Sequence, residues 1–437
     1  MSKEEAKAIS LKALVDKENN RVIFVESDED FTDVLFSFLT MPMGTIIRLI
    51  SNHNQPPTVG MGCMNNLYES IKNLDMQRFR MKHARPCCYD DGVVREDCKK
   101  LVFDARDRGV FVKGLTQFII SDELQVKPSS IEASLSLLSK IGLMDCSAIE
   151  EYNIDIGVDE VLTLLMCSLV SKKPLTETLL KQNSAPKFGK EDFDRNIYVK
   201  STVEEPESNV DGKIHVKLIV SKSKKMVCYA EASEEFVDLV SSFLTFPLGY
   251  IIKEMRSDFS IGSLTHLYNG VQDLNVEKYF KSNEHKEMLI NPKLAPDFSY
   301  ENHPLGIEEG LHPKYCYAEH SCYHSQLTSD GEIPCGSYAR SSILTVKDPK
   351  SHFKEATRGG FVAGPAMFTI TDNLIITPMS QVQSLCLLKE LKVSISDIEE
   401  RVVHVGREKA LRLLVASFVS ESALTNAFLK EPNSYFS

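Results

Sequence analysis

Cysteines and histidines gather between residues 312 and 335 in a composition typical of a metal site. The segment contains His312, Cys316, His320, Cys322, His324 and Cys335. Structural zinc takes four ligands, usually cysteine sulfurs and histidine nitrogens, in a tetrahedron. The three cysteines with His320 or His324 would complete such a set, and we select Cys316, Cys322, Cys335 and His324 as candidate zinc ligands. A local metal site would also explain how a long, weakly apolar segment is ordered.

The spacing of these cysteines departs from that of standard zinc sites. Five residues separate Cys316 from Cys322 and twelve separate Cys322 from Cys335, without a tight Cys-x-x-Cys pair. The alternative interpretation is a set of ordinary thiols and exposed histidines. Zinc analysis of the purified protein distinguishes the two, because a metal-free, fully folded sample would contradict the zinc site.

The rest of the chain carries no standard catalytic motif. Sets of the GxSxG, HExxH, DxDxDG and kinase types are absent. The glycines around Gly62 and Gly364 lack a Walker lysine, so turns and strand ends explain them better than a phosphate loop. Asp122 and Asp372 each follow an apolar strand, where a carboxylate either takes part in catalysis or caps a turn or helix. We favour capping for both.

A long internal duplication organises the chain. Residues 10–50 and 215–255 align without gaps and are identical at about 16 of 41 positions. The correspondence continues at other offsets, with Tyr68 matching Tyr268 and Asp122 matching Asp372. One ancestral unit used twice therefore replaces the two to four unrelated domains that the length alone would allow.

The duplication predicts where the modules begin and end. We expect a first module at residues 1–182, a polar linker at 183–212, and a second module at 213–437. The second copy is longer because of an insert at about 285–355, which holds the candidate zinc ligands.

Hydrophobic periodicity predicts an α+β fold for each module. Alternating residues around polar turns predict an N-terminal β-hairpin in both copies, at about 11–25 and 216–230. Residues 31–38 have the i, i+3, i+4, i+7 spacing of an amphipathic helix. Thr40 is a candidate cap for a second helix that starts near Pro42. Further strands are expected within 109–126.

Capping signals predict the helices in the second part of each module. The sequence Ser129-Ser-Ile-Glu132 has capping-box spacing, and Gly142 would close the helix that follows. Ser380 is the matching cap in the second copy. Residues 159–170 and 407–419 predict another pair of amphipathic helices, so helices should cover the strands of each module.

Composition narrows the classes of protein and of partner. The net charge of −11 and the pI of about 5.6 disfavour binding to nucleic acid or to anionic membranes, because both attract surfaces rich in Lys and Arg. Eleven cysteines, an odd number, favour reduced thiols over a disulfide framework. The polar N-terminus lacks the apolar stretch expected of a signal peptide, and no apolar run has the length expected of a transmembrane helix. We expect a cytoplasmic location, with the nucleus left open.

Three long phrases of the sequence are distinctive, and both copies carry a version of each: VDKENNRVIFVESDEDFTDVLFSFLTMPMGTIIRL, GVFVKGLTQFIISDEL and the C-terminal SALTNAFL. In these phrases the chain resembles a plant family of unknown function, DUF674. The resemblance implies a plant source, an intracellular setting and a tandem architecture, and it implies no activity. The family's insert has a tyrosine-preceded cysteine, a second cysteine and a Cys-x-Cys-Gly, which Cys316, Cys322 and Cys335 match, while Ile333 stands where a fourth cysteine is expected.

The leading functional prediction is a non-enzymatic interaction or scaffold protein built from two related modules, with a protein partner. A duplicated fold without a matched set of polar catalytic residues suits a binding surface better than chemistry. One alternative is a zinc-dependent adaptor that acts through the insert. The other is an enzyme with a site between the modules, built from repeated residues such as Asp33/Asp238, Thr40/Thr245 and Tyr68/Tyr268.

Overall fold

The computed structural model describes most of both repeats. Described are residues 8–51, 61–74, 110–143, 146–180, 214–255, 261–295, 298, 303–310, 361–362 and 366–429, together with the backbone of three strands between 314 and 345. The predicted linker at 183–212 lies outside these residues.

The first repeat folds into an α+β unit around one antiparallel sheet. Its elements are β1 (Ile9–Asp16), β2 (Arg21–Ser27), α1 (Glu29–Thr40), α2 (Met43–Ser51), α3 (Met64–Asn73), β3 (Phe118–Ser121), β4 (Val126–Pro128), α4 (Ile131–Lys140), β5 (Ile149–Ile156), α5 (Val158–Val170) and α6 (Pro174–Leu179). The strands lie in the order β4-β3-β2-β1-β5. The predicted hairpin is β1–β2, and residues 31–38 lie within α1, as predicted.

The second repeat has the same plan. Its elements are β6 (Ile214–Ser221), β7 (Met226–Ser233), α7 (Glu234–Ser242), η5 (Phe243–Thr245), α8 (Leu248–Met255), α9 (Leu264–Asp273), α10 (Val276–Tyr279), α11 (Asn283–Ile290), β11 (Met367–Thr371), β12 (Ile376–Pro378), α12 (Gln381–Glu390), β13 (Ile398–Val405), α13 (Arg407–Val419) and α14 (Ala423–Phe428). Its sheet has the order β12-β11-β7-β6-β13, which matches the first sheet strand for strand. The tandem α+β architecture is confirmed.

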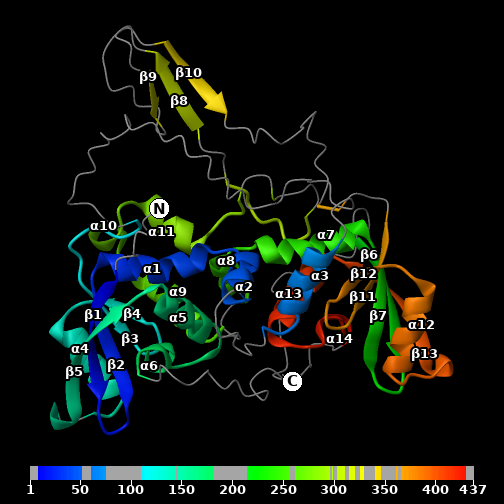
Figure 1. Cartoon of the computed structure of the whole chain (residues 1–437), viewed down its shortest axis with the longest axis horizontal. Coiled ribbons are helices and arrows are strands. Elements are labelled where there is room, and N and C mark those ends of the chain that lie inside the picture. The colour runs from blue at the N-terminus through cyan, green and yellow to red at the C-terminus, as the bar shows by residue number, and fades with distance from the viewer. Residues whose placement is uncertain are drawn as a thin grey trace, which may run out of the picture.

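The insert of the second repeat adds a small sheet of its own. Strands β8 (Lys314–Glu319), β9 (Ser325–Thr328) and β10 (Arg340–Thr345) form it in the order β10-β8-β9 (Figure 1). Both neighbours of β8 run antiparallel to it.

Of the three predicted caps, the one of α12 is confirmed, the one of α4 is displaced by one residue, and Thr40 is wrong. Ser130 and Ser380 cap α4 and α12, because their side-chain oxygens accept hydrogen bonds from the N–H groups of Ala133 and Gln383. The cap of α4 is thus the second serine of the predicted box, one residue later than expected. Thr40 caps nothing, since its hydroxyl donates to the carbonyl of Ser37, at 2.9 Å, within its own helix.

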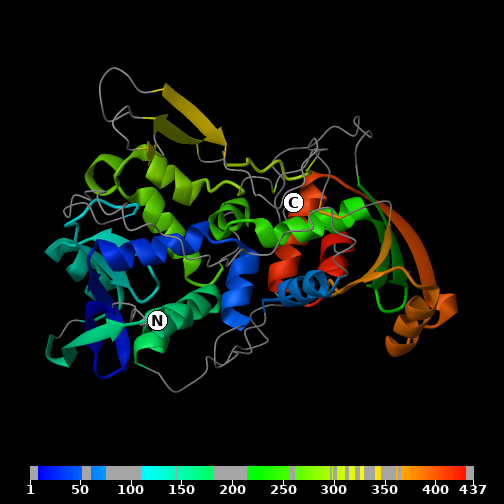
Figure 2. The same cartoon turned by 45° about the horizontal axis from the view of Figure 1, so that its top comes forward.

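The two repeats exchange a helix. Helix α3 of the first repeat packs against β12 of the second, and α9 of the second packs against β4 of the first. Figures 1 and 2 both show the blue α3 beside the red α13 of the second repeat. At the centre, Pro42 and Pro247 face each other in an antiparallel bridge. The arrangement is that of a two-fold dimer within one chain.

The same backbone contacts hold both exchanged helices. The N–H of Cys63, before α3, donates to the carbonyl of Ser417 at 2.8 Å, and the N–H of Ser263, before α9, donates to the carbonyl of Ser168 at 2.9 Å. Buried side chains from both repeats accordingly form one continuous hydrophobic core. Two smaller clusters lie on the opposite faces of the sheets, under α4 and α12.

Candidate functional site

The predicted zinc ligands lie almost wholly outside the described residues. Cys322, His324 and Cys335 are not among them, and neither is His320. Cys316 lies on β8, where its backbone pairs with Thr328 of β9 and Ile343 of β10. In the described part of the chain, no three or more His, Cys, Asp or Glu side chains gather in a group that could hold a metal ion. The zinc site stays a prediction.

The repeated residues that suggested a site between the modules are used inside the fold. The carboxylate of Asp33 accepts hydrogen bonds from the N–H groups of Val110, Phe111 and Val112, the last two at 3.0 and 3.2 Å. Asp238 accepts one from Val362, at 2.8 Å, in the matching loop. Burial raises the pKa of Asp33 above its ordinary value, against the effect of these hydrogen bonds. Both carboxylates therefore hold a loop against a helix.

The hydroxyls of the same set do not converge with these carboxylates. Thr40 lies seven residues after Asp33 on α1, about 10 Å along the helix axis. Tyr68 lies on the exchanged helix α3. The hydroxyl of Tyr268 donates to the carbonyl of Ile290 at 2.8 Å, and burial raises its pKa to about 12. The three pairs form no shared site.

Asp122 and Asp372 have the capping role that we favoured over catalysis. The two oxygens of Asp122 accept hydrogen bonds from the N–H and the hydroxyl of Thr176, at 2.9 and 2.7 Å, at the start of α6. Asp372 holds Thr425 in α14 in the same way, at 2.7 and 2.8 Å. Each carboxylate thus ties a helix from about 50 residues away to the sheet, and the sequence gives no sign of this partner.

Two serine–histidine pairs of the described residues have the distance of a catalytic dyad. In the first, Nδ1 of His285 lies 2.8 Å from the hydroxyl of Ser282, which caps α11. In the second, the Nε2 atom of His303 lies 2.9 Å from the hydroxyl oxygen of Ser242. However, Nδ1 of His303 accepts a hydrogen bond from the N–H of Leu305, at 3.1 Å, so Nε2 carries the proton. An imidazole that already has a proton on Nε2 cannot accept one from the serine. The Ser242 hydroxyl itself donates to the carbonyl of Leu239, at 2.6 Å.

The buried thiols are equally unsuited to chemistry. Among the described residues, Cys63, Cys167 and Cys228 are buried free cysteines and Cys386 is an exposed one. Burial raises the pKa of Cys63 and of Cys167 to about 12. A reactive cysteine needs a lowered pKa and access to solvent, so these two are structural.

A shallow groove lies where the two repeats meet. It has a volume of about 280 Å³ and runs between β4 of the first repeat and helices α9 and α10 of the second. The residues that line it are Gln125, Val126, Lys127, Pro128, Gly270, Asp273, Leu274, Asn275, Lys278 and Tyr279. This is the position that the enzyme alternative would require.

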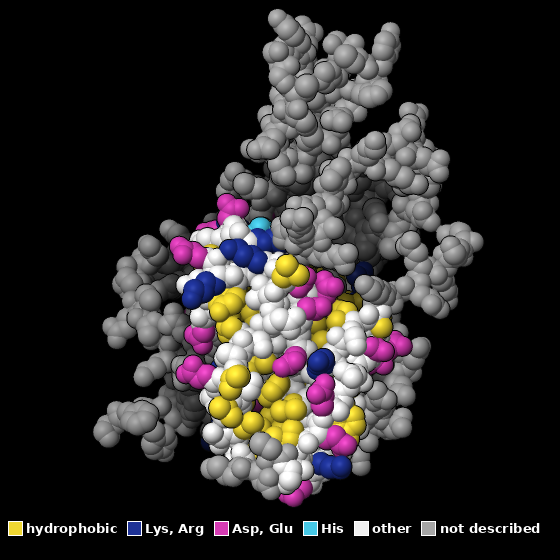
Figure 3. Space-filling view, turned by 90° about the vertical axis from the view of Figure 1, so that its left-hand side faces the viewer, with side chains coloured by type: hydrophobic (Ala, Val, Ile, Leu, Met, Phe, Trp, Pro, Cys, Tyr) yellow, Lys and Arg dark blue, Asp and Glu magenta, His cyan; other side chains and the backbone are white. Residues whose placement is uncertain are grey.

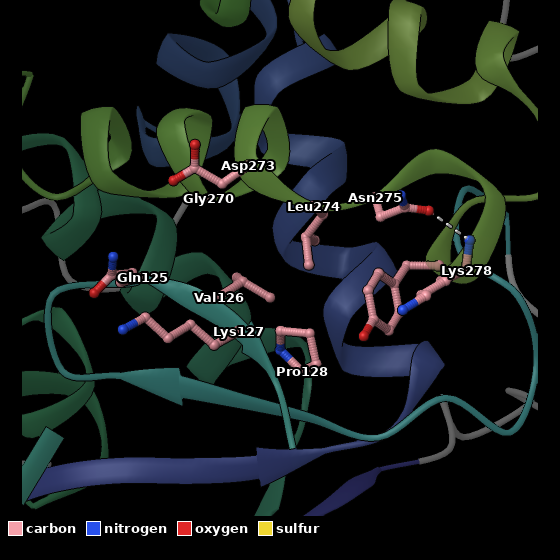
Figure 4. Close-up of a pocket in the computed structure, with 10 residues that line it drawn as sticks. Gln125, Val126, Lys127, Pro128, Gly270, Asp273, Leu274, Asn275 and Lys278 are labelled. Atoms are coloured by element: carbon pink, nitrogen blue, oxygen red, sulfur yellow. Dashed lines mark hydrogen bonds between the residues drawn. The ribbon is translucent and has the colours of Figure 1, made fainter. Parts of the chain in front are cut away.

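The polar groups of this groove do not converge on a point. Figure 4 shows the side-chain nitrogens of Lys127 and Lys278 at opposite ends, with Asp273 on the other wall. The side-chain oxygen of Asn275 accepts a hydrogen bond from the backbone N–H of Lys278, at 3.0 Å, and caps α10. The lining contains no nucleophile beside a base. The lining of the groove thus carries no catalytic set.

Within the described residues, no helix is long and apolar enough to cross a membrane. No curated protein and no solved structure matches the chain. A family model described as "Protein of unknown function (DUF674)" matches residues 5–101 and 89–408, which together span most of the chain. The protein therefore belongs to the DUF674 family.

Proposed function

We propose that the protein is a non-enzymatic interaction scaffold of two related modules, at residues 1–182 and 213–437, which binds protein partners through the outer helices α4 and α12. The observation that carries the proposal is a matched pair of exposed apolar rows. Leu135 on α4 and Leu385 on α12 occupy equivalent positions, and their exposed fractions are 57% and 59%. About one turn earlier, Ile131 on α4 is 80% exposed and Val382 on α12 is 71% exposed, at neighbouring rather than equivalent positions, because Gln381 matches Ile131.

The location of these rows supports a binding role. Each helix covers the outer face of its sheet with one side, through Leu137 in α4 and Leu388 in α12. The other side, which holds the exposed row, faces away from the protein. Figure 3 views the end of the molecule that carries α4 and β5, where hydrophobic side chains gather in patches between charged ones. An apolar patch with a polar rim is typical of a protein interface.

The use of the repeated polar residues inside the fold supports a role without catalysis. Asp33, Asp122 and their counterparts in the second repeat bind backbone or helix-start groups. Two equivalent surfaces on one rigid chain would also allow a scaffold to hold two partners, or two sites of one partner, with a gain in avidity.

The test is affinity capture with the full-length protein and with Leu135→Glu and Leu385→Glu variants. Both sites are exposed on helices, so thermal unfolding should be unchanged. Ser136→Glu and Gln383→Glu, at exposed neighbouring positions, are the matched controls. A partner that is lost only from the leucine variants, and that binds the purified protein directly, supports the proposal. A partner retained by both leucine variants contradicts it.

The same capture distinguishes the two alternatives. A zinc-dependent adaptor predicts a partner that is released by a chelator and by Cys316→Ser, but retained by the leucine variants. An enzyme with a site between the modules predicts a co-purifying small molecule and no partner.

A further inference from the structure

Two histidines face each other on the outer surface of the second sheet. His215 on β6 and His404 on the edge strand β13 are register partners. Their ring centroids are 4.4 Å apart and the ring planes meet at 77°. Both side chains are exposed, on the face of the sheet opposite to the main core, to which the next residues, Val216 and Val405, belong.

The strand register brings these two side chains as close as a sheet allows. The N–H of Lys222 donates to the carbonyl of Asp397, at 3.0 Å, which marks a hydrogen-bonded pair. Hydrogen-bonded and non-hydrogen-bonded pairs alternate along antiparallel strands. His215 and His404 lie seven residues farther along, so they form a non-hydrogen-bonded pair, in which the Cα atoms are only about 4.5 Å apart.

The charge on the same face does not oppose a cation. Lys217, two residues along β6, forms ion pairs with Glu231 and Glu400, at 3.4 and 3.0 Å, so its charge is compensated. Lys409 donates from Nζ to the backbone carbonyl of His404, at 3.1 Å. The imidazoles keep their open side toward solvent.

We propose that His215 and His404 together bind one divalent late transition-metal ion, each through one ring nitrogen. Neutral imidazole is a good ligand for Cu²⁺, Ni²⁺ and Zn²⁺. At a given nitrogen site, Cu²⁺ binds more tightly than either of the other two ions. Metal–nitrogen bonds of about 2.0–2.1 Å hold two nitrogens roughly 3 Å apart on one ion. The ring centroids are 4.4 Å apart, so rotation of the exposed rings from their edge-to-face packing would bring one nitrogen of each to that separation. Water would fill the other positions, because no third ligand stands among the described neighbours.

Isothermal titration of the full-length protein with Ni²⁺ tests the site. His215→Asn and His404→Asn should each weaken the site at least tenfold, while His266→Asn, at an exposed histidine on α9, should leave it unchanged. Binding should weaken in acid, because protons compete with the metal ion for imidazole nitrogens. Paramagnetic Ni²⁺ should broaden the ring C–H signals of the two histidines together. When Cys316, Cys322 and Cys335 are also replaced by serine, nickel binding that survives the double His→Asn change overturns the proposal, and so does the absence of binding.

Two further variants separate this site from others. The titration is repeated with Cys316, Cys322 and Cys335 all replaced by serine, and the histidine site should persist. In the first sheet the equivalent register partners are Ser10 and Asp155. Replacing both by histidine should add a second Ni²⁺ per chain, and failure to do so counts against the geometric argument.

Discussion

The hydroxyl of Ser70 in α3 accepts a hydrogen bond from the backbone N–H of Ile376 in β12, at 3.1 Å, across 306 residues of sequence. Gly270 holds the equivalent place on α9, opposite Val126 of β4, which lines the groove between the repeats. A Cβ atom at Gly270 would lie 3.2 Å from the nitrogen of Val126. One repeat thus has a hydrogen bond where the other has a close backbone approach.

Ser70→Gly should lower the free energy of unfolding by about 1–2 kcal/mol, from the lost hydrogen bond and the lower helix propensity of glycine. Ser136→Gly, at an exposed position of α4, measures the propensity part alone.

Gly270→Ser should instead stabilise the protein by up to about 1 kcal/mol. A hydroxyl would then reach the N–H of Val126, and the short edge strand β4 can move by a few tenths of an ångström to make room. Urea unfolding gives all three values. Equal losses in both serine variants would contradict the hydrogen bond.

Gly62→Ala and Gly262→Ala should be among the most damaging single changes. Both glycines have φ of +50°, and a Cβ atom would lie 2.7 Å from the Ser417 carbonyl oxygen at Gly62 and 2.3 Å from that of Ser168 at Gly262. We expect losses of about 3 kcal/mol or more, from overpacking and backbone strain together. Gly142→Ala is the control, since its φ is +76° but nothing lies within 4 Å. A loss equal to that of the control would show that contact between the repeats is not what these glycines provide.

Asp122→Ala and Asp372→Ala should each cost about 2–4 kcal/mol, because the start of a buried helix loses two acceptors. The Asn variants keep one acceptor and should lose less. Burial raises the pKa of both carboxyls above the ordinary 3.8. A raised pKa in the folded state favours the protonated form, so the stability of the native protein relative to the Asn variants should fall as the pH rises from about 4 through the raised pKa. A difference that is flat with pH would contradict this.

His303 should make stability depend on pH. Burial lowers its pKa to about 4 in the folded protein, from an ordinary value of 6.5. Above pH 6.5 the imidazole is neutral in both the folded and the unfolded state, so burying it costs no stability through protonation. As the pH falls from 6.5 towards 4 the unfolded state binds the proton first, and the free energy of unfolding should fall by up to about 3 kcal/mol. Urea unfolding between pH 4.5 and 7.5 should show this slope, His303→Gln should reduce it, and His266→Gln should leave it. An unchanged slope in His303→Gln would contradict the assignment.

Metal analysis checks the predicted zinc site in the insert. We expect one zinc ion per chain, lost when Cys316, Cys322 and Cys335 are replaced by serine and reduced by His324→Asn. Removal of the metal by a chelator should lower the melting temperature, because metal binding contributes free energy of folding. Folded protein without zinc would contradict the prediction.

The local parts of the fold could be predicted because short-range patterns determine them. Hairpin β1–β2 follows from alternation, α1 from the spacing of Phe31 to Phe38, and α12 from the cap at Ser380. Strands β5 and β13 were missed. Each is an edge strand with an exposed middle, at residues 151–153 and 400–402, so the alternation of buried and exposed residues is weak there.

The exchange of α3 and α9 could not be predicted, for a physical reason. An amphipathic helix shows which of its faces is buried but not which sheet covers it. Here the two sheets derive from related sequences, so the apolar face of α3, with Leu67 at its centre, suits either one. The groove residues Val126 and Gly270 were missed for the same reason, because they become neighbours only through the exchange.

The exchange also constrains how the two copies could diverge after duplication. A residue on α3 contacts a residue of the other repeat. A change at Ser70 therefore removes a contact with Ile376 of the second repeat and not one within its own repeat. A change at one of the two interfaces leaves the equivalent interface untouched, so the two can differ, as they do at Ser70 and Gly270.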